Sequence, residues 1–153
     1  EPHATNGPTT RFLDVGSHPS KTKNFVMQIL DAGQSGTTMT VPTDQVGNVT
    51  YAPNFTEALT ELLEQGQSGL YHLAGTTRCS KHEWAVITAE LFQVDPSLIN
   101  GVSTAEMNQA GPRPLESGFI LDKAISHLSR THLLTLTEGL RDMNQRMRED
   151  ARL

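Results

Sequence analysis

The side chains in this sequence that could carry chemistry are few, and they show no known catalytic spacing. Six histidines are present, but no HExxH pattern or close pair places two imidazoles on one helix face, where they could bind a metal ion. His127 and His132 lie on either side of a predicted helix end. Neither Tyr51 nor Tyr71 is followed by a lysine four positions later. The residues of this chain therefore predict no catalytic group and no metal site of their own.

Nucleotide-binding and acyl-transfer motifs are also missing from the sequence. It has no GxGxxG or GxxGxxG turn, no GxxxxGK[ST] phosphate loop and no GxSxG nucleophile elbow. Cys79 is the only cysteine, so no internal disulfide and no cysteine-based zinc site can form within the chain. No neighbouring feature activates its thiol, and we expect Cys79 to be inert.

Size and charge narrow the classes of partner. The 153 residues correspond to one domain or slightly more, and 36% are hydrophobic, enough for a modest core. The net charge is -5 and the 12 Lys and Arg residues are scattered, which argues against nucleic acid or an anionic membrane as partner. No apolar run reaches the roughly 18 residues of a membrane span. We expect a cytoplasmic protein. Because the sequence begins at Glu1 rather than Met, we expect the chain to be either processed or cut from a longer one.

The elements that must position polar side chains follow from hydrophobic spacing and end signals. Apolar residues recur at intervals of three and four in several stretches, which predicts helices there. The predicted helices are Asn24–Ala32 with Gly33 as stop, a helix capped by Asn54 with Glu57 and closed by Gly66, a helix capped by Ser80 with Glu83 and ended before Pro96, Asp122–Leu128, and a helix from Thr135 to about Arg148.

Short apolar and β-branched runs predict strands between these helices. They are Arg11–Val15, Thr37–Val41, a buried strand Leu70–Ala74 bounded by two glycines, and Leu98–Val102. We expect Tyr71, His72 and Trp84 to be core side chains. Ser103 with Glu106 offers one more capping box, and residues 108–118 are expected to be loop. Short strands alternating with helices indicate an α/β domain.

Four segments in one order carry a resemblance to a known family. They are Asn24-Phe25-Val26 at a helix start, Asp44–Thr50 (DQVGNVT), Gly69–Gly75 (GLYHLAG) and Arg113–Ser117 (RPLES). Over roughly residues 11–150, the sequence resembles the C-terminal, substrate-binding half of the RmlD-like (dTDP-4-dehydrorhamnose reductase) branch of the extended short-chain dehydrogenase/reductase family.

The resemblance implies a fold and a division of the chain. The expected fold class is α/β: a small substrate-binding lobe of an extended short-chain dehydrogenase that lacks most of the Rossmann cofactor half. Residues 1–23 are then a polar lead-in with one crossing strand, Arg11–Val15, and residues 24–153 are the RmlD-like substrate-binding domain.

The resemblance also implies an activity and partners. The family reduces the 4-keto group of a dTDP-6-deoxysugar with NADPH, and its glycine-rich turn and Tyr-x-x-x-Lys lie in the N-terminal half. NADPH would thus be bound mainly outside this chain. The expected partners are a nucleotide-sugar substrate and the N-terminal Rossmann half, in cis or as a partner chain. Nucleic acid and membrane are not expected.

The family motifs assign site residues in this sequence. Arg113 carries a planar guanidinium that can hold a diphosphate or a carboxylate through two hydrogen bonds, on a loop that Pro114 stiffens. At a helix N-terminus, Asn24 is well placed to face an anion. The expected substrate-binding residues are Asn24, Arg113 and Ser117, and those expected to support a tight turn and the contact between lobes are Asp44, Gln45, Gly47 and Thr50.

Purely structural roles are open for the same residues. Asn24 is a good N-cap. Asp44 and Gln45 can brace the turn that follows them, and Arg113 can form an ion pair between domains.

Two other functions are open as well. One is a non-catalytic regulatory subunit of the kind that binds methionine adenosyltransferase. Such a regulatory subunit has the same fold and similar motifs. The other is a fragment of a nucleotide-sugar epimerase or dehydratase, a hypothesis that rests on Gly16–Pro19 (GSHP) alone. The segment Arg113–Ser117 favours the reductase and the regulatory subunit over the epimerase.

Overall fold

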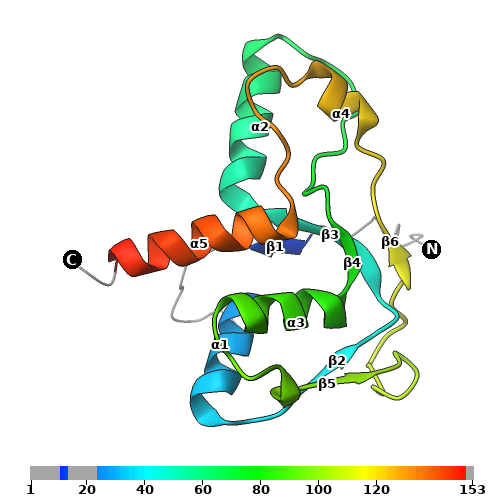
Figure 1. Cartoon of the computed structure of the whole chain (residues 1–153). Helices are drawn as coiled ribbons and strands as arrows, with labels where there is room; N and C mark the ends of the chain where they lie inside the picture. Colours follow the sequence, from blue (N-terminus) through cyan, green and yellow to red (C-terminus); the bar gives the residue numbers. More distant parts are fainter. Residues whose placement is uncertain (1–10, 14–23, 151–153) are drawn as a thin grey trace.

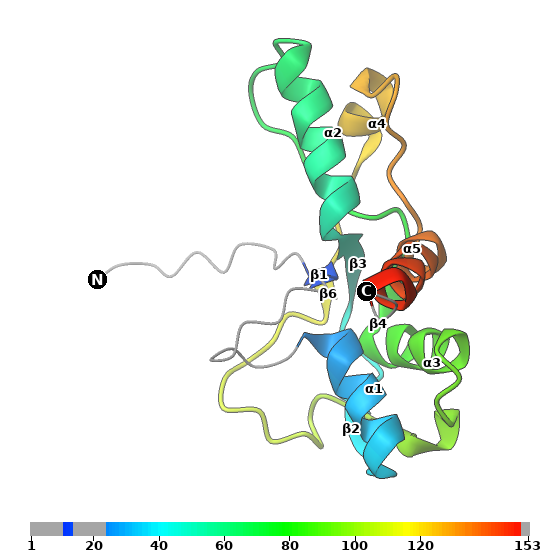
Figure 2. The same ribbon diagram turned by 90° about the vertical axis from the view of Figure 1, so that its left-hand side faces the viewer.

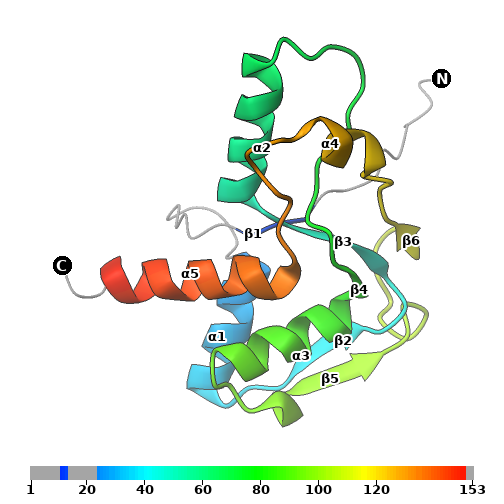
Figure 3. The same ribbon diagram turned by 45° about the horizontal axis from the view of Figure 1, so that its top comes forward.

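A computed structural model of the chain describes residues 11–13 and 24–150. Most of the predicted polar lead-in, including the Gly16–Pro19 segment, lies outside the described residues. Two views agree on the arrangement of the rest (Figures 1 and 3). Helices α2 and α4 lie at one end, α1 and α3 lie with the strands β2 and β5 at the other, and α5 crosses between them. The α/β class predicted from the sequence is confirmed.

The α1/α3 end contains its own sheet. Strands β2 (Met39–Pro42) and β5 (Ile99–Val102) pair in parallel, in a register that places Met39 opposite Ile99. Helices α1 (Phe25–Ser35) and α3 (Lys81–Leu91) pack together, α3 also lies on this strand pair, and a short 3-10 helix (Pro96–Leu98) leads into β5. The apolar residues that meet here are Ile29, Val41, Ala85, Ala89 and Ile99.

Both helices of this end begin as predicted. The Asn24 side chain accepts a hydrogen bond from Met27 N at 2.9 Å, and Ser80 and Glu83 form the full capping box of α3. The predicted stop at Gly33 is wrong, because α1 continues to Ser35 and ends at Gly36, whose φ is +66°. A Cβ on Gly33 would lie 2.7 Å from Val94 Cγ2. Gly33 therefore permits a close approach of two segments and does not end the helix.

The centre of the molecule is built on β3 (Val46–Tyr51), a strand in a region where the sequence predicted a tight turn. It pairs in parallel with β1 (Arg11–Leu13) and β6 (Glu116–Ser117), and antiparallel with β4 (Arg78–Ser80). Helix α5 (Leu136–Asp150) packs against β3, and its predicted cap by Thr135 and Glu138 is present. The buried residues of this central core are Val26, Val49, Tyr51, Cys79, Trp84, Leu136, Leu140 and Met143, so the packing role predicted for Trp84 is confirmed.

At the other end, α2 (Ala52–Glu64) follows β3 without a loop. The prediction that Asn54 caps this helix is wrong: the helix already begins at Ala52, and Asn54 is buried within its first turn. Pro53 suits this first turn because its missing N–H is not needed there. The Asn54 side chain instead donates to His132 O at 3.0 Å and accepts from Leu134 N at 2.9 Å. It thus fastens the segment that leads from α4 (Asp122–His127) to α5.

The predicted strand Leu70–Ala74 is wrong for the part of the chain that the structure describes, because no neighbouring strand pairs with it. Leu73 and Ala74 are buried, but His72 is exposed and Tyr71 only half-buried, so the expected core histidine is also wrong. The paired strand of this region is β4, a few residues later.

Side chains of β3 hold the end of this extended segment in place of a strand partner. Asn48 Nδ2 donates to Gly75 O at 2.8 Å, and Gly75 N donates to Thr50 Oγ1 at 3.4 Å. Apolar content fixes the burial of Leu73 and Ala74, but the pairing of a strand needs a partner that the described chain does not supply.

Candidate functional site

The candidate site is the loop between β5 and β6, residues 103–115, together with the segment of β3 that holds it. This loop projects from the side of the molecule opposite α3 and α5 (Figure 2). It carries Arg113, and β6, which follows it, carries Ser117. Two sets of contacts close its base, one near its beginning and one near its end.

The first set joins the residues just before β3 to Thr104. The Asp44 carboxylate accepts from Thr104 N at 2.9 and 3.1 Å and from Thr104 Oγ1 at 2.6 Å. Gln45, which is 5% exposed, donates from Nε2 to Thr104 Oγ1 at 3.0 Å and to Gln109 Oε1 at 3.1 Å. The Thr104 hydroxyl, and then its backbone N–H, lower the pKa of Asp44 below its ordinary value. Asp44 is thus an ionised acceptor whose oxygens are engaged by the loop.

The second set joins the start of β3 to the end of the loop. Val46 N donates to Leu115 O at 2.7 Å, and Ser117 Oγ donates to Val46 O at 3.1 Å. A Cβ on Gly47 would lie 2.7 Å from Ser117 Oγ. The predicted tight turn at Gly47 is therefore wrong: the chain bends at Thr43 and Asp44, and Gly47 is a strand residue whose lack of a side chain makes room for Ser117.

Arg113 lies between the two sets of contacts and is exposed. Within the described residues its guanidinium forms no ion pair and no hydrogen bond. The neighbouring carboxylate of Glu116 is engaged by Arg78 in an ion pair. The loop therefore presents one cation toward solvent, flanked by Pro112 and Pro114, which restrict its backbone.

The other predicted site residues lie elsewhere. Asn24 is half-buried at the N-terminus of α1, where its side chain caps the helix. Thr50 is buried in the second half of β3 and accepts from Gly75 N. The structure thus brings Asp44, Gln45, Gly47 and Ser117 together at the base of the loop. It places Thr50 farther along the strand and Asn24 on a different element.

Sequence reasoning missed three polar residues of this region. Thr104 and Gln109 complete the contacts of Asp44 and Gln45, and Asn48 joins two segments by donating to Gly75 O and accepting from Phe119 N at 2.8 Å. All of these contacts link residues far apart in the sequence. The spacing of one chain carries no signal for them, although a threonine and a glutamine in a loop of that length are natural candidates for such bonds.

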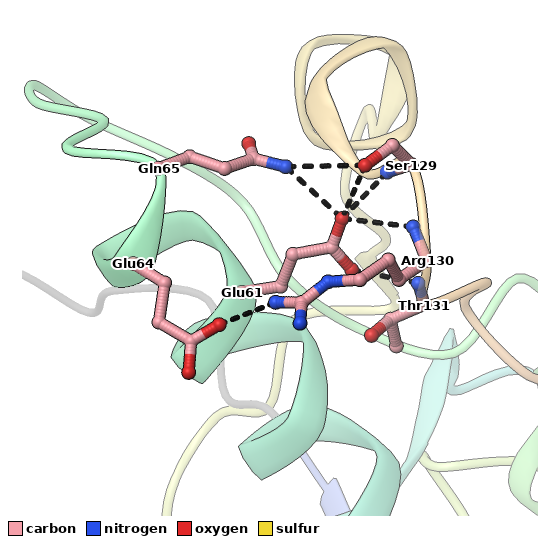
Figure 4. A network of polar contacts seen from close by, with 6 residues as sticks. All are labelled: Glu61, Glu64, Gln65, Ser129, Arg130 and Thr131. Atoms are coloured by element: carbon pink, nitrogen blue, oxygen red, sulfur yellow. Dashed lines mark hydrogen bonds and ion pairs between the residues drawn. The ribbon is translucent and has the colours of Figure 1, made fainter.

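A second polar cluster is centred on Glu61 of α2, and its carboxylate is already occupied by hydrogen bonds (Figure 4). Glu61 is 1% exposed, and its carboxylate accepts from Ser129 N at 2.6 Å, Arg130 N at 2.9 Å and Thr131 N at 2.6 Å. Burial alone would raise the pKa of Glu61, but the N–H groups of Arg130, Ser129 and Thr131 hold it well below its ordinary value. A carboxylate that stays ionised and has its oxygens filled by fixed donors is a structural anchor, not an acid or base.

An apolar groove of about 420 Å³ lies beside α2. It is lined by Phe55, Leu59, Leu62, Leu63, Gln67, Gly69, Leu70, Tyr71, His72, Leu73 and Phe119. Leu63 and Leu70 are 66% and 78% exposed. The Lys123 ammonium group lies over the ring of Tyr71, one of the lining residues, at 3.9 Å from the ring centroid.

Residues 11–13 and 24–150 contain neither a metal-binding cluster nor a helix that could span a membrane. In that part of the chain, no group of three or more His, Cys, Asp and Glu side chains is arranged to hold a metal ion. None of the helices described there is long and apolar enough to cross a membrane.

Comparisons with known proteins identify the fold. Residues 15–149 match the family model "RmlD substrate binding domain". A dTDP-4-dehydrorhamnose reductase from Bacillus anthracis, solved in complex with NADP, superposes with a TM-score of 0.72 at 25% identity, over 80% of this chain and 43% of that one. A dTDP-4-dehydrorhamnose reductase from Clostridium acetobutylicum superposes with a TM-score of 0.77 at 19% identity, over 91% and 47%.

A curated relative is similar to this chain in sequence. The spore coat polysaccharide biosynthesis protein SpsK of Bacillus subtilis is 30% identical over 94 residues, which are 61% of this chain and 32% of SpsK. The chain thus spans less than half the length of these relatives. The family match covers nearly the whole sequence. The chain belongs to the RmlD substrate-binding domain family of the extended short-chain dehydrogenases.

Proposed function

We propose that this chain is the substrate-binding portion of an NADPH-dependent nucleotide-sugar reductase of the dTDP-4-dehydrorhamnose reductase type. The observation that carries the proposal is the likeness to the reductase of Bacillus anthracis, whose structure contains NADP, combined with an unpaired arginine on a loop that is fastened at both ends. Residues 24–153 form the substrate-binding domain in this proposal, and residues 1–23 lead into it.

Arg113 is the residue that would hold the substrate. An exposed guanidinium without an ion pair among the described residues is available for two parallel hydrogen bonds to a diphosphate. The hydroxyl of Ser117 donates to Val46 O, and the Asn24 side chain caps α1. In the proposed site these two residues therefore contribute less than Arg113, and the Ser117 oxygen is left as an acceptor for a sugar hydroxyl.

The reaction needs groups that this chain does not contain. NADPH, when bound by the cofactor half, supplies the hydride for the keto carbon, and the resemblance places the tyrosine that supplies the proton in that half. The contribution of the present residues is to bind the nucleotide sugar and to orient its keto group. Asp44, Gln45, Gly47 and Thr50 serve this role indirectly by holding β3 and the loop in place.

The cofactor half is the partner proposed for the apolar groove beside α2. Exposed leucines at its rim, Leu63 and Leu70, are unusual for a free surface and are typical of an interface. The extended segment 71–74 lies along the same groove with no strand paired to it. A cofactor-binding half, present in cis or as a separate chain, would cover both features. This location of the interface, like a cytoplasmic site of action, is part of the proposal.

The direct experiment is an assay of the complete protein, with the cofactor half present, for NADPH oxidation in the presence of a dTDP-4-keto-6-deoxysugar. We expect NADPH consumption, and we expect Arg113→Ala to raise KM by at least about tenfold with a smaller change in kcat, since it removes a contact to the bound substrate. Arg141→Ala, which removes an exposed arginine of α5, is the matched control and should leave KM unchanged.

Other results would favour the alternatives. If the complete protein consumed no NADPH and copurified with a second enzyme whose activity it changed, the regulatory-subunit hypothesis would replace the reductase. Interconversion of two nucleotide sugars without net use of cofactor would indicate an epimerase. An unchanged KM in Arg113→Ala would remove Arg113 from the site while leaving the reductase activity itself established.

A further inference from the structure

We infer that Thr104 is a positioning residue, which sets the orientation of Arg113 toward the substrate by locking the beginning of the β5–β6 loop onto Asp44 and Gln45. The inference rests on the proposed function for its substrate and goes beyond it by assigning a role to a residue that no motif singles out. Thr104 itself does not touch the substrate in this proposal.

The contacts of Thr104 are unusually complete for a loop residue. Its N–H and its hydroxyl both donate to the Asp44 carboxylate, and the hydroxyl oxygen accepts from Gln45 Nε2. The hydroxyl group therefore both donates and accepts, and each bond joins residues about 60 positions apart in the sequence. Hydrogen bonds to an ionised carboxylate are stronger than neutral ones, so these contacts of Thr104, the first junction of the loop, hold it rigidly.

A second set of contacts, which follows Arg113 in the sequence, fixes the end of the loop and forms its second junction with the start of β3. Leu115 O accepts from Val46 N, and Ser117 is seated against Gly47. Because Thr104 and Leu115 are both fixed to consecutive residues of one segment, Asp44 to Val46, the ten residues between them form a loop whose ends cannot separate. Loosening either junction would give Arg113 more orientations, and a loosely held cation loses affinity for a diphosphate.

The side chain of Thr104 can be altered without changing its shape. In Thr104→Val, the backbone N–H still donates to Asp44, but the hydroxyl bonds to Asp44 and Gln45 are lost. Thr104→Ser restores the hydroxyl. Thr43→Val is the matched control: it removes the hydroxyl bond from a neighbouring threonine to Val102 O, which lies outside the loop.

The experiment measures two properties of the full 153-residue chain. The first is hydrogen exchange of the backbone amides over residues 105–111. The second is the affinity for dTDP in titration calorimetry, measured for wild type, Thr104→Val, Arg113→Ala and the double variant. We expect Thr104→Val to accelerate exchange by about tenfold or more, because the first junction opens locally, and Thr104→Ser and Thr43→Val to stay at the wild-type rate.

For dTDP, we expect Thr104→Val and Arg113→Ala each to weaken binding by about tenfold, and the double variant to be no weaker than Arg113→Ala alone. Such non-additivity would not arise if Thr104 were merely structural. Unchanged exchange in Thr104→Val, or losses that simply add in the double variant, would overturn the inference. If wild type bound no dTDP while the exchange difference remained, the contact proposed between Arg113 and substrate would be overturned, and with it the substrate role of Thr104, but the locking of the loop would stand.

Discussion

The two ends of the molecule hold themselves together by different means. At the α1/α3 end, the parallel pair β2–β5 satisfies its own backbone and carries two helices over a continuous apolar core. At the α2/α4 end, extended segments run between the helices without pairing, and polar side chains bond to their backbone instead. The α1/α3 end thus has a paired sheet and an apolar core of its own. The α2/α4 end exposes Leu63, Leu70 and Ile120 and has the character of a surface that another element covers.

The polar side chains that hold the α2/α4 end come mainly from β3 and α2. Asn48 and Thr50 bond to Gly75, Asn54 to the chain around His132, and Glu61 to residues 129–131. Each anchor replaces a few backbone bonds that a sheet would have formed. This end depends on single side chains more heavily than the β2–β5 pair does, because only scattered backbone hydrogen bonds, such as Thr76 N to Leu134 O at 2.9 Å, join its extended segments. The predictions below test this contrast.

The largest effect is expected where the α2/α4 end meets the central sheet. A Cβ on Gly75 would lie 2.0 Å from Val49 O and 3.0 Å from Leu134 O, both backbone atoms that cannot move independently. We expect Gly75→Ala to lower the free energy of unfolding by about 4 kcal/mol or more, measured by urea denaturation. Gly111→Ala is the control, since nothing lies within 4 Å of its added Cβ, and it should be close to neutral. Equal stability of the two variants would show that the segment does not pass as closely under β3 as described.

The second prediction compares an apolar residue from each end. Ile29 is fully buried in the core of the α1/α3 end, and Ile29→Ala should cost about 2–5 kcal/mol of unfolding free energy. Leu63, at the rim of the groove, is two-thirds exposed, and Leu63→Ala should change stability by less than about 0.5 kcal/mol. A large loss of stability in Leu63→Ala would mean that the groove is packed in the isolated chain.

The third prediction removes the charge of the anchor at Glu61. Glu61→Gln keeps the shape of the side chain but turns one acceptor oxygen into a donor that faces the N–H groups of residues 129–131. We expect a fall in melting temperature of roughly 5 °C or more and faster hydrogen exchange in residues 128–134, with the β2–β5 pair unaffected. Glu64→Gln provides the control, because Glu64 is exposed and its partner among the described residues is the Arg130 side chain. It should leave the melting temperature nearly unchanged.

How far the sequence could predict this molecule differs between its two ends. The helices α1, α3 and α5 and the strands β2 and β5 were found because periodicity and capping residues are local signals. At the α2/α4 end the same rules misplaced the start of α2 and predicted a strand at Leu70–Ala74. There the chain is shaped by contacts such as Asn54 to Leu134 N, which span 80 positions and leave no local trace.

The candidate site shows the same division between local and distant signals. Arg113 was identified from its motif and is indeed presented on a loop, and Asp44 and Gln45 do brace a neighbouring segment. Their partners, Thr104 and Gln109, could not be found from spacing, because nothing in one sequence says which loop returns to which strand. The position of Gly47 within β3 was missed for a related reason, since a glycine predicts either a turn or a close approach.

The smallest expected effect is a change with pH in the contribution of Glu61 to the free energy of unfolding. Burial would raise the pKa of Glu61, but the N–H groups of Arg130, Ser129 and Thr131 hold it well below the ordinary value of 4.5. The unfolded chain therefore takes up this proton at a higher pH than the folded chain. The stabilisation from Glu61 is fully present above about pH 5 and is lost progressively as the pH falls further.

Comparing wild type with Glu61→Gln isolates this contribution. The pKa values of Glu83, Glu106 and Glu138 are lowered as well, by hydrogen bonds from Ser80, Ser103 and Thr135, but their effects are the same in both proteins and cancel in the difference. We expect the gap in unfolding free energy, measured by urea denaturation from about pH 7 to about pH 4, to narrow toward the acid side because only wild type loses stability from Glu61 there. A gap that stayed constant over this range would mean that the backbone of residues 129–131 is held by the shape of the Glu61 side chain and not by its charge, and the α2/α4 end would then owe its structure to packing, as the α1/α3 end does.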